Sequence, residues 1–316
     1  MKAMIIEAYG GPGQLHVADR PVPEPSDDEI LIEVVYTSVN PMDWKIRQGY
    51  MRDIFPHELP LIPGGDAAGI VRRVGRNVSA YKGGERVFAY ARKPTIQWGT
   101  YAEFVTVQAD AVAPIPPNLS FAQAAAIPLT ALTAWQALFD AAGLDSGQSV
   151  LIHGGAGGVG GMAIQFARNA GAKVYTTATG RNHEYVRRLG AHHPIDYTAK
   201  NFAEVLRKAE PHGVDVVLDT LGGPVLQQSY PLVKRGGVLI SIIERPNEKT
   251  AQQQGIRPGF VFVTPNGVQL RQIAGLLEEG AVKPPRIEEM RLEDAAAAQE
   301  RSRGRHVAGK IVLRIK

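Results

Sequence analysis

The stretch Ser149–Gly171, SVLIHGGAGGVGGMAIQFARNAG, constrains the fold more than any other part of the chain. The apolar run before its glycines predicts a buried strand, and the apolar spacing after them predicts a helix. Between these elements, Gly155, Gly157 and Gly160 have the spacing G-x-G-x-x-G. In a strand–turn–helix unit this spacing permits a tight turn, close approach of the backbone to a pyrophosphate and close helix–strand packing. The order of elements therefore predicts a dinucleotide site at the N-terminus of the helix, where free N–H groups and the helix dipole favour phosphate.

The residues after the next predicted strand distinguish NAD from NADP. An NAD-type site usually has an acidic residue about 20 positions beyond the fingerprint, where it binds the ribose 2′-hydroxyl. No carboxylate occurs between Gly160 and Glu184. Hydroxyl residues up to Thr179, followed by Arg181, occupy that place, and a guanidinium matches a 2′-phosphate. The sequence favours NADP(H); the alternative is that Arg181 is an ordinary solvated loop cation.

Composition narrows the class of protein. Of the 316 residues, 44% are hydrophobic and 21% are charged, which is typical of a soluble globular protein with a substantial core. The net charge of +4 includes no basic block, so no nucleic-acid partner is predicted. The chain has no cysteine, which excludes disulfides and thiolate metal sites. No apolar run reaches the roughly 18 residues of a membrane span and no secretory pattern occurs, so a cytoplasmic location without membrane contact is expected.

The pattern of elements divides the chain into three segments. Residues 1–118 contain short strand-like runs separated by proline and glycine clusters, which predicts a β-barrel-like first domain. Residues 119–255 alternate strands and helices, which predicts a doubly wound parallel sheet. Residues 256–316 return to strand-forming sequence, and we expect them to complete the first domain. Besides those of the glycine-rich stretch, the expected strands are 30–36, 69–75, 85–90, 173–178, 195–197, 214–218, 238–243, 260–264 and 310–315, and the expected helices are 120–140, 183–189, 201–209, 224–233 and 266–279.

Several short motifs along the whole chain resemble one protein family. They are Ser38–Lys45, Pro63–Gly69, Gly84–Val87, Gly99–Glu103, Ile127–Thr133, the glycine turn and Gly309–Leu313. Together they are similar to the medium-chain dehydrogenases/reductases, specifically the zinc-free quinone oxidoreductase (zeta-crystallin-like) branch. The resemblance implies an α/β fold: a Rossmann doubly wound parallel sheet that binds NADP at 119–255, and a GroES-like β-barrel catalytic domain at 1–118 completed by 256–316. It also implies a homodimer.

The chain departs from the zinc-containing relatives at each metal position. Their cysteine ligand falls at Asn40 and their His-Glu pair at Gly65-Asp66, and neither asparagine nor glycine replaces a thiolate or an imidazole. Only eleven residues, Phe88–Trp98, stand where those relatives insert a four-cysteine lobe. No metal site is therefore predicted. Oxidation of an alcohol through a zinc-bound alkoxide is not expected.

The chemistry implied by the resemblance is reduction of quinones or α,β-unsaturated carbonyls by hydride from NADPH. Hydride addition to such acceptors places charge on a conjugated oxygen, which hydrogen-bond donors suffice to stabilise. The resemblance implies that Asn40 lies near the nicotinamide ribose and substrate, and that Tyr50 places its hydroxyl over the active site as a donor. The alternative for Tyr50 is that it merely packs in a loop.

The resemblance also implies a set of cofactor-binding residues. Arg181 corresponds to the 2′-phosphate cation and Tyr197 to the aromatic residue beside the adenosine phosphate. Two positions depart from the family pattern, because Ile242 stands in an Ile-Ile-Glu run after the last Rossmann strand and Ala308 precedes Lys310 where others have Arg. The full expected set is Thr133, Gly155, Gly157, Gly158, Val159, Gly160, Thr179, Arg181, Tyr197, Thr220, Ile242 and Lys310.

Two other functions remain open from the sequence. A reductase of enoyl thioesters shares the chemistry but requires a long acyl pocket. A cofactor-binding protein with little catalysis, serving a structural or RNA-binding role, is the second alternative. Other polar residues have plainer expected roles: His153 is expected to be structural, Asp43 and Asp66 to support loops through hydrogen bonds, and the arginines at 301, 303 and 305 to form an exposed stretch.

Overall fold

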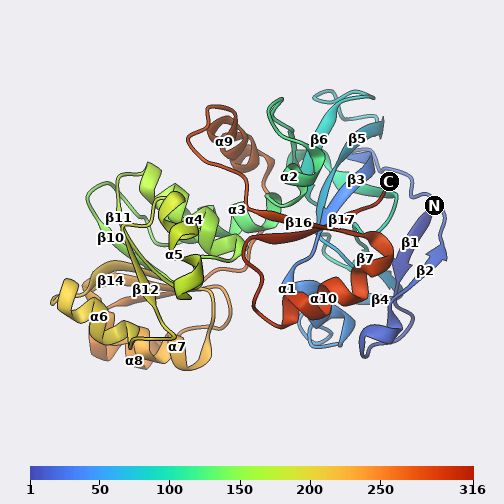
Figure 1. Cartoon of the computed structure of the whole chain (residues 1–316). Coiled ribbons are helices and arrows are strands. Elements are labelled where there is room, and N and C mark those ends of the chain that lie inside the picture. The colour runs from blue at the N-terminus through green and yellow to red at the C-terminus, as the bar shows by residue number, and fades with distance from the viewer. The chain divides into compact units, whose positions relative to one another are not determined.

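A computed structural model describes all 316 residues, which divide into two compact units (Figure 1). Unit 1 comprises Met1–Leu129, Thr264–Gly280 and Pro284–Lys316. Unit 2 comprises Thr130–Val263 with Ala281–Lys283. The chain therefore leaves the first unit, builds the second and returns to the first. None of the helices combines the length and the apolarity that crossing a bilayer demands.

Unit 1 is built on a mostly antiparallel seven-stranded sheet. The C-terminal strand, Lys310–Arg314, lies inside this sheet. It pairs in parallel with Ile287–Arg291 on one side and antiparallel with Glu29–Ser38 on the other. The strand order is β16 (Ile287–Arg291), β17 (Lys310–Arg314), β3 (Glu29–Ser38), β5 (Asp66–Val74), β6 (Arg86–Tyr90) and β9 (Val112–Pro114), with β8 (Phe104–Gln108) also on β3. Two small sheets pair β1 (Lys2–Ile5) with β2 (His16–Asp19) and β4 (His57–Ile62) with β7 (Ile96–Trp98).

The helices of unit 1 are α1 (Pro41–Arg47), α2 (Phe121–Ala125), α9 (Gly267–Glu278) and α10 (Ala295–Arg303). Strand β3 crosses the centre of the unit and is buried over most of its length. Alternate residues Ile30, Ile32 and Val34 pack with Val71, Val87 and Val105 in one apolar cluster. Burying this alternating face makes the central strand a rigid support for the residues that follow it, which begin α1.

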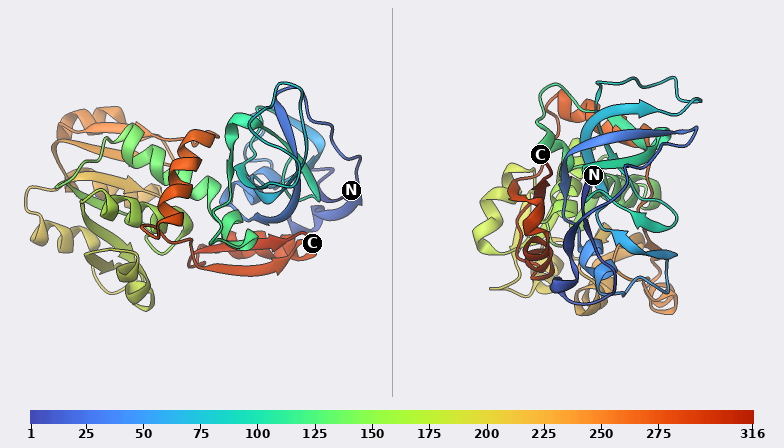
Figure 2. Two further views of the ribbon diagram at one scale, coloured as in Figure 1. Left: turned by 90° about the horizontal axis from the view of Figure 1, so that it is seen from above. Right: turned by 90° about the vertical axis from the view of Figure 1, so that its right-hand side faces the viewer.

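Unit 2 is a six-stranded parallel sheet with helices on both faces (Figures 1 and 2). The strand order is β12 (His193–Asp196), β11 (Lys173–Ala178), β10 (Ser149–Ile152), β13 (Val214–Asp219), β14 (Val233–Ser241) and β15 (Arg257–Phe260). The connecting helices are α4 (Gly158–Asn169), α5 (His183–Arg188), α6 (Phe202–Ala209), α7 (Gly223–Ser229) and α8 (Glu248–Gln254). The order reverses beside β10, and in such sheets ligands bind at the carboxyl ends of the strands at this switch point. The α/β fold with a doubly wound parallel sheet is confirmed.

Several expected elements differ from the structure in their bounds: the helix expected at 224–233 ends at Ser229, and the strand expected at 238–243 runs over Val233–Ser241. Two others differ more strongly. The strand expected at 260–264 is wrong, because Arg257–Phe260 forms β15 and pairs in parallel with Val238–Ser241 of β14. The helix expected over 120–140 is interrupted: α2 ends at Ala125, α3 (Pro128–Trp135) follows, and a wider helical turn continues over Gln136–Ala141. Pro128 explains the break, since proline has no N–H to continue a helix but suits its first turn.

Candidate cofactor site and a buried polar network

The glycine turn joins β10 to α4, and two of its glycines are required by packing within the protein. A Cβ at Gly155 would overlap Thr176 Oγ1 and lie 2.9 Å from Ile164 Cδ1. A Cβ at Gly160 would overlap the Gly154 carbonyl oxygen and lie 2.8 Å from its carbon. These positions therefore let the helix and the strand approach closely.

Gly157 is different, because nothing within the protein requires a glycine there. It has φ −79° and ψ 175°, which any residue adopts, and it is the N-cap of α4. A Cβ at this position would meet only the Gly154 carbonyl oxygen, at an ordinary 3.4 Å. The missing side chain leaves the backbone bare where the first N–H groups of a twelve-residue helix lack intrahelical acceptors. This bare backbone fits a pyrophosphate, which needs close approach to such groups.

A chain of hydrogen bonds through His153 supports the turn from below. Ser229 Oγ donates to the Val225 carbonyl at 2.7 Å, so it accepts from His153 Nε2–H at 2.9 Å. His153 Nδ1 is then an acceptor for the Thr177 hydroxyl at 3.2 Å. Thr177 Oγ1 in turn accepts the N–H of Gly154 at 3.1 Å. A single neutral tautomer of His153 thus connects α7 to the glycine turn.

The protonation state of His153 agrees with this geometry. The ring is fully buried, and its burial lowers the pKa to about 3. Its backbone carbonyl accepts from Thr220 Oγ1 at 2.8 Å. His153 is therefore a neutral connector between the turn and the end of β13.

Most of the expected cofactor residues lie at one edge of the sheet of unit 2. Thr179 and Arg181 follow β11, Tyr197 follows β12, Thr220 follows β13 and Ile242 follows β14. All these strands are parallel, so their carboxyl ends meet at the edge that carries the glycine turn, with Gly158 and Val159 in the first turn of α4. Arg181 is exposed and has no ion-pair partner, and Tyr197 is also exposed. Thr133 is buried in α3.

A buried carboxylate that the sequence did not single out shapes the same edge. Asp219, the last residue of β13, accepts from the backbone N–H groups of Leu221 and Gly222 at 3.0 Å each. Its second oxygen accepts from Ser241 Oγ at the end of β14, at 2.7 Å. Asp219 therefore holds the loop that presents Thr220. The sequence does contain a signal for this role, because Asp219 ends an apolar strand and is followed closely by the pair Gly222-Gly223.

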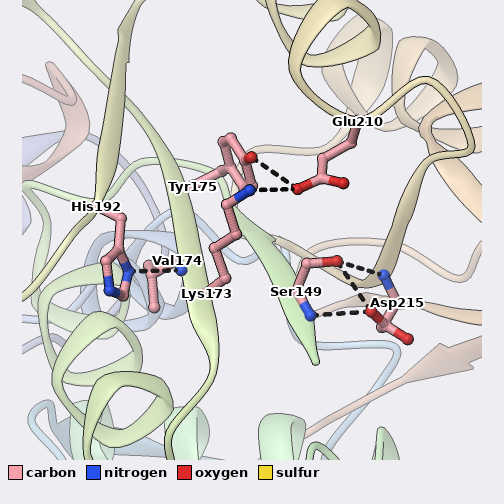
Figure 3. A network of polar contacts seen from close by, with 7 residues as sticks. All are labelled: Ser149, Lys173, Val174, Tyr175, His192, Glu210 and Asp215. Carbon is pink, nitrogen blue, oxygen red and sulfur yellow. Dashed lines mark hydrogen bonds and ion pairs between the residues drawn. The ribbon is translucent and has the colours of Figure 1, made fainter. Parts of the chain in front are cut away.

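The opposite edge of the sheet carries a different polar network (Figure 3). Ser149, at the start of β10, donates from its N and its Oγ to Asp215 at 2.9 Å. Tyr175 and Lys173 both donate to Glu210, at 2.7 and 2.8 Å. These contacts join the first residues of strands to one another and to Glu210 at the end of α6, whereas parallel sheets bind ligands at the carboxyl ends of the strands. We regard this network as structural.

In unit 1, Asn40 and Lys310 belong to a buried polar network. Asn40 is the N-cap of α1 and is 1% exposed. Its Nδ2 donates to Asp66 Oδ2 at 2.7 Å, and its Oδ1 accepts from Lys310 Nζ at 2.5 Å. Lys310 Nζ also donates to the Val39 carbonyl at 2.7 Å. Through these two contacts Lys310 orients Asn40 within unit 1.

Two carboxylates complete the network. Asp66 accepts from Ser38 Oγ at 2.6 Å and from the Leu129 N–H at 2.7 Å. Asp43 accepts from the Asn40 N–H at 2.8 Å and from the Tyr101 hydroxyl at 2.9 Å. Both carboxylates support loops through hydrogen bonds, as their expected roles require.

Burial dominates the electrostatics of these three charged groups. It raises the pKa of Asp43 to about 7 against the opposing N–H and O–H donors. It raises the pKa of Asp66 and lowers that of Lys310, while Lys310 and the two carboxylates each favour the other's charged form. No group of three or more His, Cys, Asp or Glu side chains is arranged as metal ligands, and the positive charge beside Asp66 comes from Lys310.

Tyr50 lies at the surface of unit 1, just after α1. Its side chain is 64% exposed. The ring meets Trp44 edge-on, with centroids 6.1 Å apart and an interplanar angle of 85°. Most of the side chain is thus open to solvent.

Comparison with known proteins covers both units. Residues 26–117 match the family described as alcohol dehydrogenase GroES-like domain, and residues 189–313 match the family described as zinc-binding dehydrogenase. A quinone oxidoreductase of Mus musculus is 36% identical over 330 residues, which cover 99% of this chain and 97% of the relative. An NADPH-dependent alkenal/one oxidoreductase of Arabidopsis thaliana chloroplasts is 35% identical over 326 residues, which cover 99% of this chain and 79% of the relative.

A solved structure agrees with this relationship over both units. Escherichia coli quinone oxidoreductase, crystallised in complex with NADPH, has a TM-score of 0.88 and 27% identity, with 100% of each chain covered. The resemblance inferred from the short motifs is thereby confirmed. The chain belongs to the quinone oxidoreductase family of the medium-chain dehydrogenases/reductases.

Proposed function

We propose that this protein is an NADPH-dependent reductase of quinones or α,β-unsaturated carbonyls. The observation that carries the proposal is the bare backbone at Gly157, which the protein's own packing does not require. It lies at the sheet edge where Arg181, Tyr197 and Thr220 also emerge. The names of the relatives, a quinone oxidoreductase and an NADPH-dependent alkenal/one oxidoreductase, indicate the same reaction class.

Within this proposal, unit 2 holds the cofactor. The first N–H groups of α4 bind the pyrophosphate past Gly155, Gly157 and Gly160. Arg181 pairs with the 2′-phosphate and Thr179 lies beside it, since a guanidinium forms two parallel bonds to such a group. Tyr197 contacts the adenosine side, while Thr133, Thr220 and Ile242 contact the remainder.

Unit 1 supplies the polar groups for the acceptor. Bound NADPH supplies a hydride, that is, two electrons and one proton, to the β-carbon of the enone or to the quinone. The negative charge that develops on the conjugated oxygen then needs a donor and finally a second proton. Tyr50 donates this hydrogen bond, and the proton comes from its hydroxyl or from solvent through it. Asn40, held by Lys310 and Asp66, keeps the start of α1 in place.

The first experiment is NADPH oxidation by the purified protein with a panel of quinones and enones. We expect turnover with several acceptors, and Tyr50→Phe to lower kcat by roughly 100-fold while the Kd for NADPH stays within about twofold. Tight NADPH binding without turnover of any acceptor would support the cofactor-binding protein instead. Unchanged kcat in Tyr50→Phe would remove its donor role.

A second experiment addresses coenzyme choice. We expect Arg181→Gln to reduce the preference for NADPH over NADH by about tenfold or more, because it removes the cation that pairs with the 2′-phosphate. Arg187→Gln, another exposed arginine of unit 2, is the matched control. An equal preference in both variants and wild type would contradict the assignment of Arg181.

We further propose a homodimer in the cytoplasm, with no nucleic-acid or membrane partner. Strand β15 is the outermost strand of its sheet and pairs only with β14, so its other edge offers unpaired backbone groups. Light scattering on a size-exclusion column measures the mass in solution. A monomer at all concentrations contradicts the dimer.

A further inference from the structure

The contact between α1 and α10 places three groups around one indole ring. Lys45 Nζ and Arg303 Cζ each lie 5.9 Å from the centre of the Trp44 ring. Tyr50, which the proposed function makes the hydrogen-bond donor, meets the same ring edge-on at 6.1 Å. Two cations and the candidate donor therefore all contact the same side chain, Trp44.

The positive charge of this cluster is not balanced by acidic residues. Lys45 is half-buried and forms no ion pair; its burial and the neighbouring guanidinium of Arg305 lower its pKa. Glu300 is the acidic residue at this contact, and it is shared between Arg47 at 2.5 Å and Arg303 at 3.2 Å. Lys45 and Arg305 thus remain as like charges with no counter-ion.

The hydrogen-bond donor of the same indole ring also lacks a partner. The Nε1 atom of Trp44 is buried and has no acceptor within the protein. Buried donors normally find an acceptor, and an unpaired one costs free energy. Lys45 and Arg305 repel each other, and the Trp44 N–H lacks an acceptor. An anionic oxygen bound here would stabilise this arrangement, because it attracts both cations and accepts hydrogen bonds.

We propose that Lys45 and Arg303, over the Trp44 ring, together with Arg305 beside Lys45, form a subsite for an acidic group on the electron acceptor. This proposal rests on the proposed function and deepens it, because it names the substrate class as quinones or enones that carry a carboxylate or a phosphate. The conjugated oxygen is placed at Tyr50, and the acidic group lies on the cationic side of Trp44. We call these three cations and Trp44 the acid subsite.

Matched pairs of acceptors test the acid subsite. Acetylacrylate and its methyl ester share one enone but differ in charge, and they form the carboxylate arm. Crotonyl-coenzyme A and the crotonyl thioester of N-acetylcysteamine share one enoyl thioester but differ in phosphates, and they form the phosphate arm. The quantity compared is the ratio of kcat/KM for the charged acceptor to that for the neutral one.

We expect a ratio well above one in at least one arm, and that arm identifies the acidic group. Lys45→Gln and Arg305→Gln each lower this ratio by about three- to tenfold, as expected for partly exposed charge pairs. Raising the ionic strength from about 0.05 M to about 0.5 M lowers it further, because salt screens such pairs. Lys82→Gln, an exposed lysine on the turn between β5 and β6, removes one charge elsewhere in unit 1 and leaves the ratio unchanged.

A binding measurement separates this proposal from the reaction itself. Levulinate and methyl levulinate lack the alkene, so they report binding without turnover, which is followed by tryptophan fluorescence or by calorimetry. We expect levulinate to bind more tightly than its ester when acetylacrylate is the preferred acceptor, and Lys45→Gln to abolish the difference. If no acceptor, charged or neutral, is reduced but levulinate still binds through Lys45, the proposed function fails and the acid subsite stands. Equal ratios in wild type, Lys45→Gln, Arg305→Gln and Lys82→Gln overturn the acid subsite.

Discussion

Lys310 donates from Nζ to Asn40 Oδ1 at 2.5 Å in the interior of unit 1, across 270 positions of sequence. Lys310 begins the C-terminal strand β17, whereas Asn40 caps α1 immediately after β3. Asp66 lies on the other side of the Asn40 amide and accepts from its Nδ2. A buried cation and a buried carboxylate therefore hold one asparagine between them, which fixes the beginning of α1.

Replacing Lys310 by methionine tests this arrangement. The change keeps the aliphatic length but leaves Asp66 buried without a cation, so we expect a loss of about 3–5 kcal/mol in the free energy of unfolding near neutral pH. The loss becomes smaller as the pH falls, because the pKa of Asp66 is raised by burial and its protonated form no longer needs the positive charge. Urea unfolding at several pH values measures both. Lys316→Met removes a half-exposed lysine from its pair with Glu33 and changes stability by less than about 1 kcal/mol. A loss that does not vary with pH would contradict the role of Lys310 as counter-ion.

Asp43 predicts a pH dependence of unit 1. Its pKa rises from 3.8 in the unfolded chain to about 7 in the folded one, so between these values the folded state binds more protons. Its contribution to stability is therefore complete below about pH 4 and is lost as the pH rises toward about 7. Asp43→Asn mimics the neutral acid and keeps an acceptor for Tyr101. We expect wild type to lose stability relative to Asp43→Asn, by on the order of a few kcal/mol, as the pH rises from about 4 to about 7. Urea unfolding followed by the tryptophans of unit 1, Trp44 and Trp98, measures the difference; a difference independent of pH rules out the raised pKa.

Local patterns predicted the parts of the fold that local interactions determine. The run before Gly155 forms β10, the run after Gly157 forms α4, and the expected strand at 173–178 is β11. By contrast, Phe260–Thr264 has strong strand-forming residues, yet β15 lies at Arg257–Phe260 because its backbone pairs with β14. Tertiary pairing overrode propensity there.

The polar contacts were less predictable because they join residues that are distant in sequence. The sequence predicts that Asp43 and Asp66 support loops, but nothing near them in sequence indicates that Lys310 lies beside them. The G-x-G-x-x-G spacing likewise does not distinguish its three glycines, although packing within the protein requires a glycine at Gly155 and Gly160 but not at Gly157. Such differences appear only when the neighbouring strands and helices are in place.

His153 predicts the opposite pH dependence in unit 2. Its pKa falls from 6.5 in the unfolded chain to about 3 in the folded one, so the unfolded state binds the extra proton between these values. Its contribution to stability is therefore complete above about pH 6.5 and is lost as the pH falls. We expect wild type to lose stability relative to His153→Gln as the pH falls from about 6.5 to about 4. Unfolding followed by Trp135, the tryptophan of unit 2, measures this difference. His16→Gln, which replaces an exposed histidine, is the control. We expect the difference in stability between wild type and His16→Gln not to vary with pH in this way. A parallel loss in wild type and His153→Gln would mean that the buried ring takes up a proton.

Gly157 and Gly160 separate cofactor binding from packing. Gly157→Ala adds a Cβ that meets only one oxygen at 3.4 Å, so we expect a melting temperature close to that of wild type. The same methyl group blocks the approach of a pyrophosphate to the start of α4, so the Kd for NADPH rises by about tenfold or more. Gly160→Ala drives a methyl group into the Gly154 backbone, and we expect it to lower stability by about 2 kcal/mol or more. Calorimetric unfolding and NADPH titration of both variants provide the comparison. If Gly157→Ala binds NADPH as tightly as wild type does, the pyrophosphate does not lie over this turn, because the added methyl group would block it there.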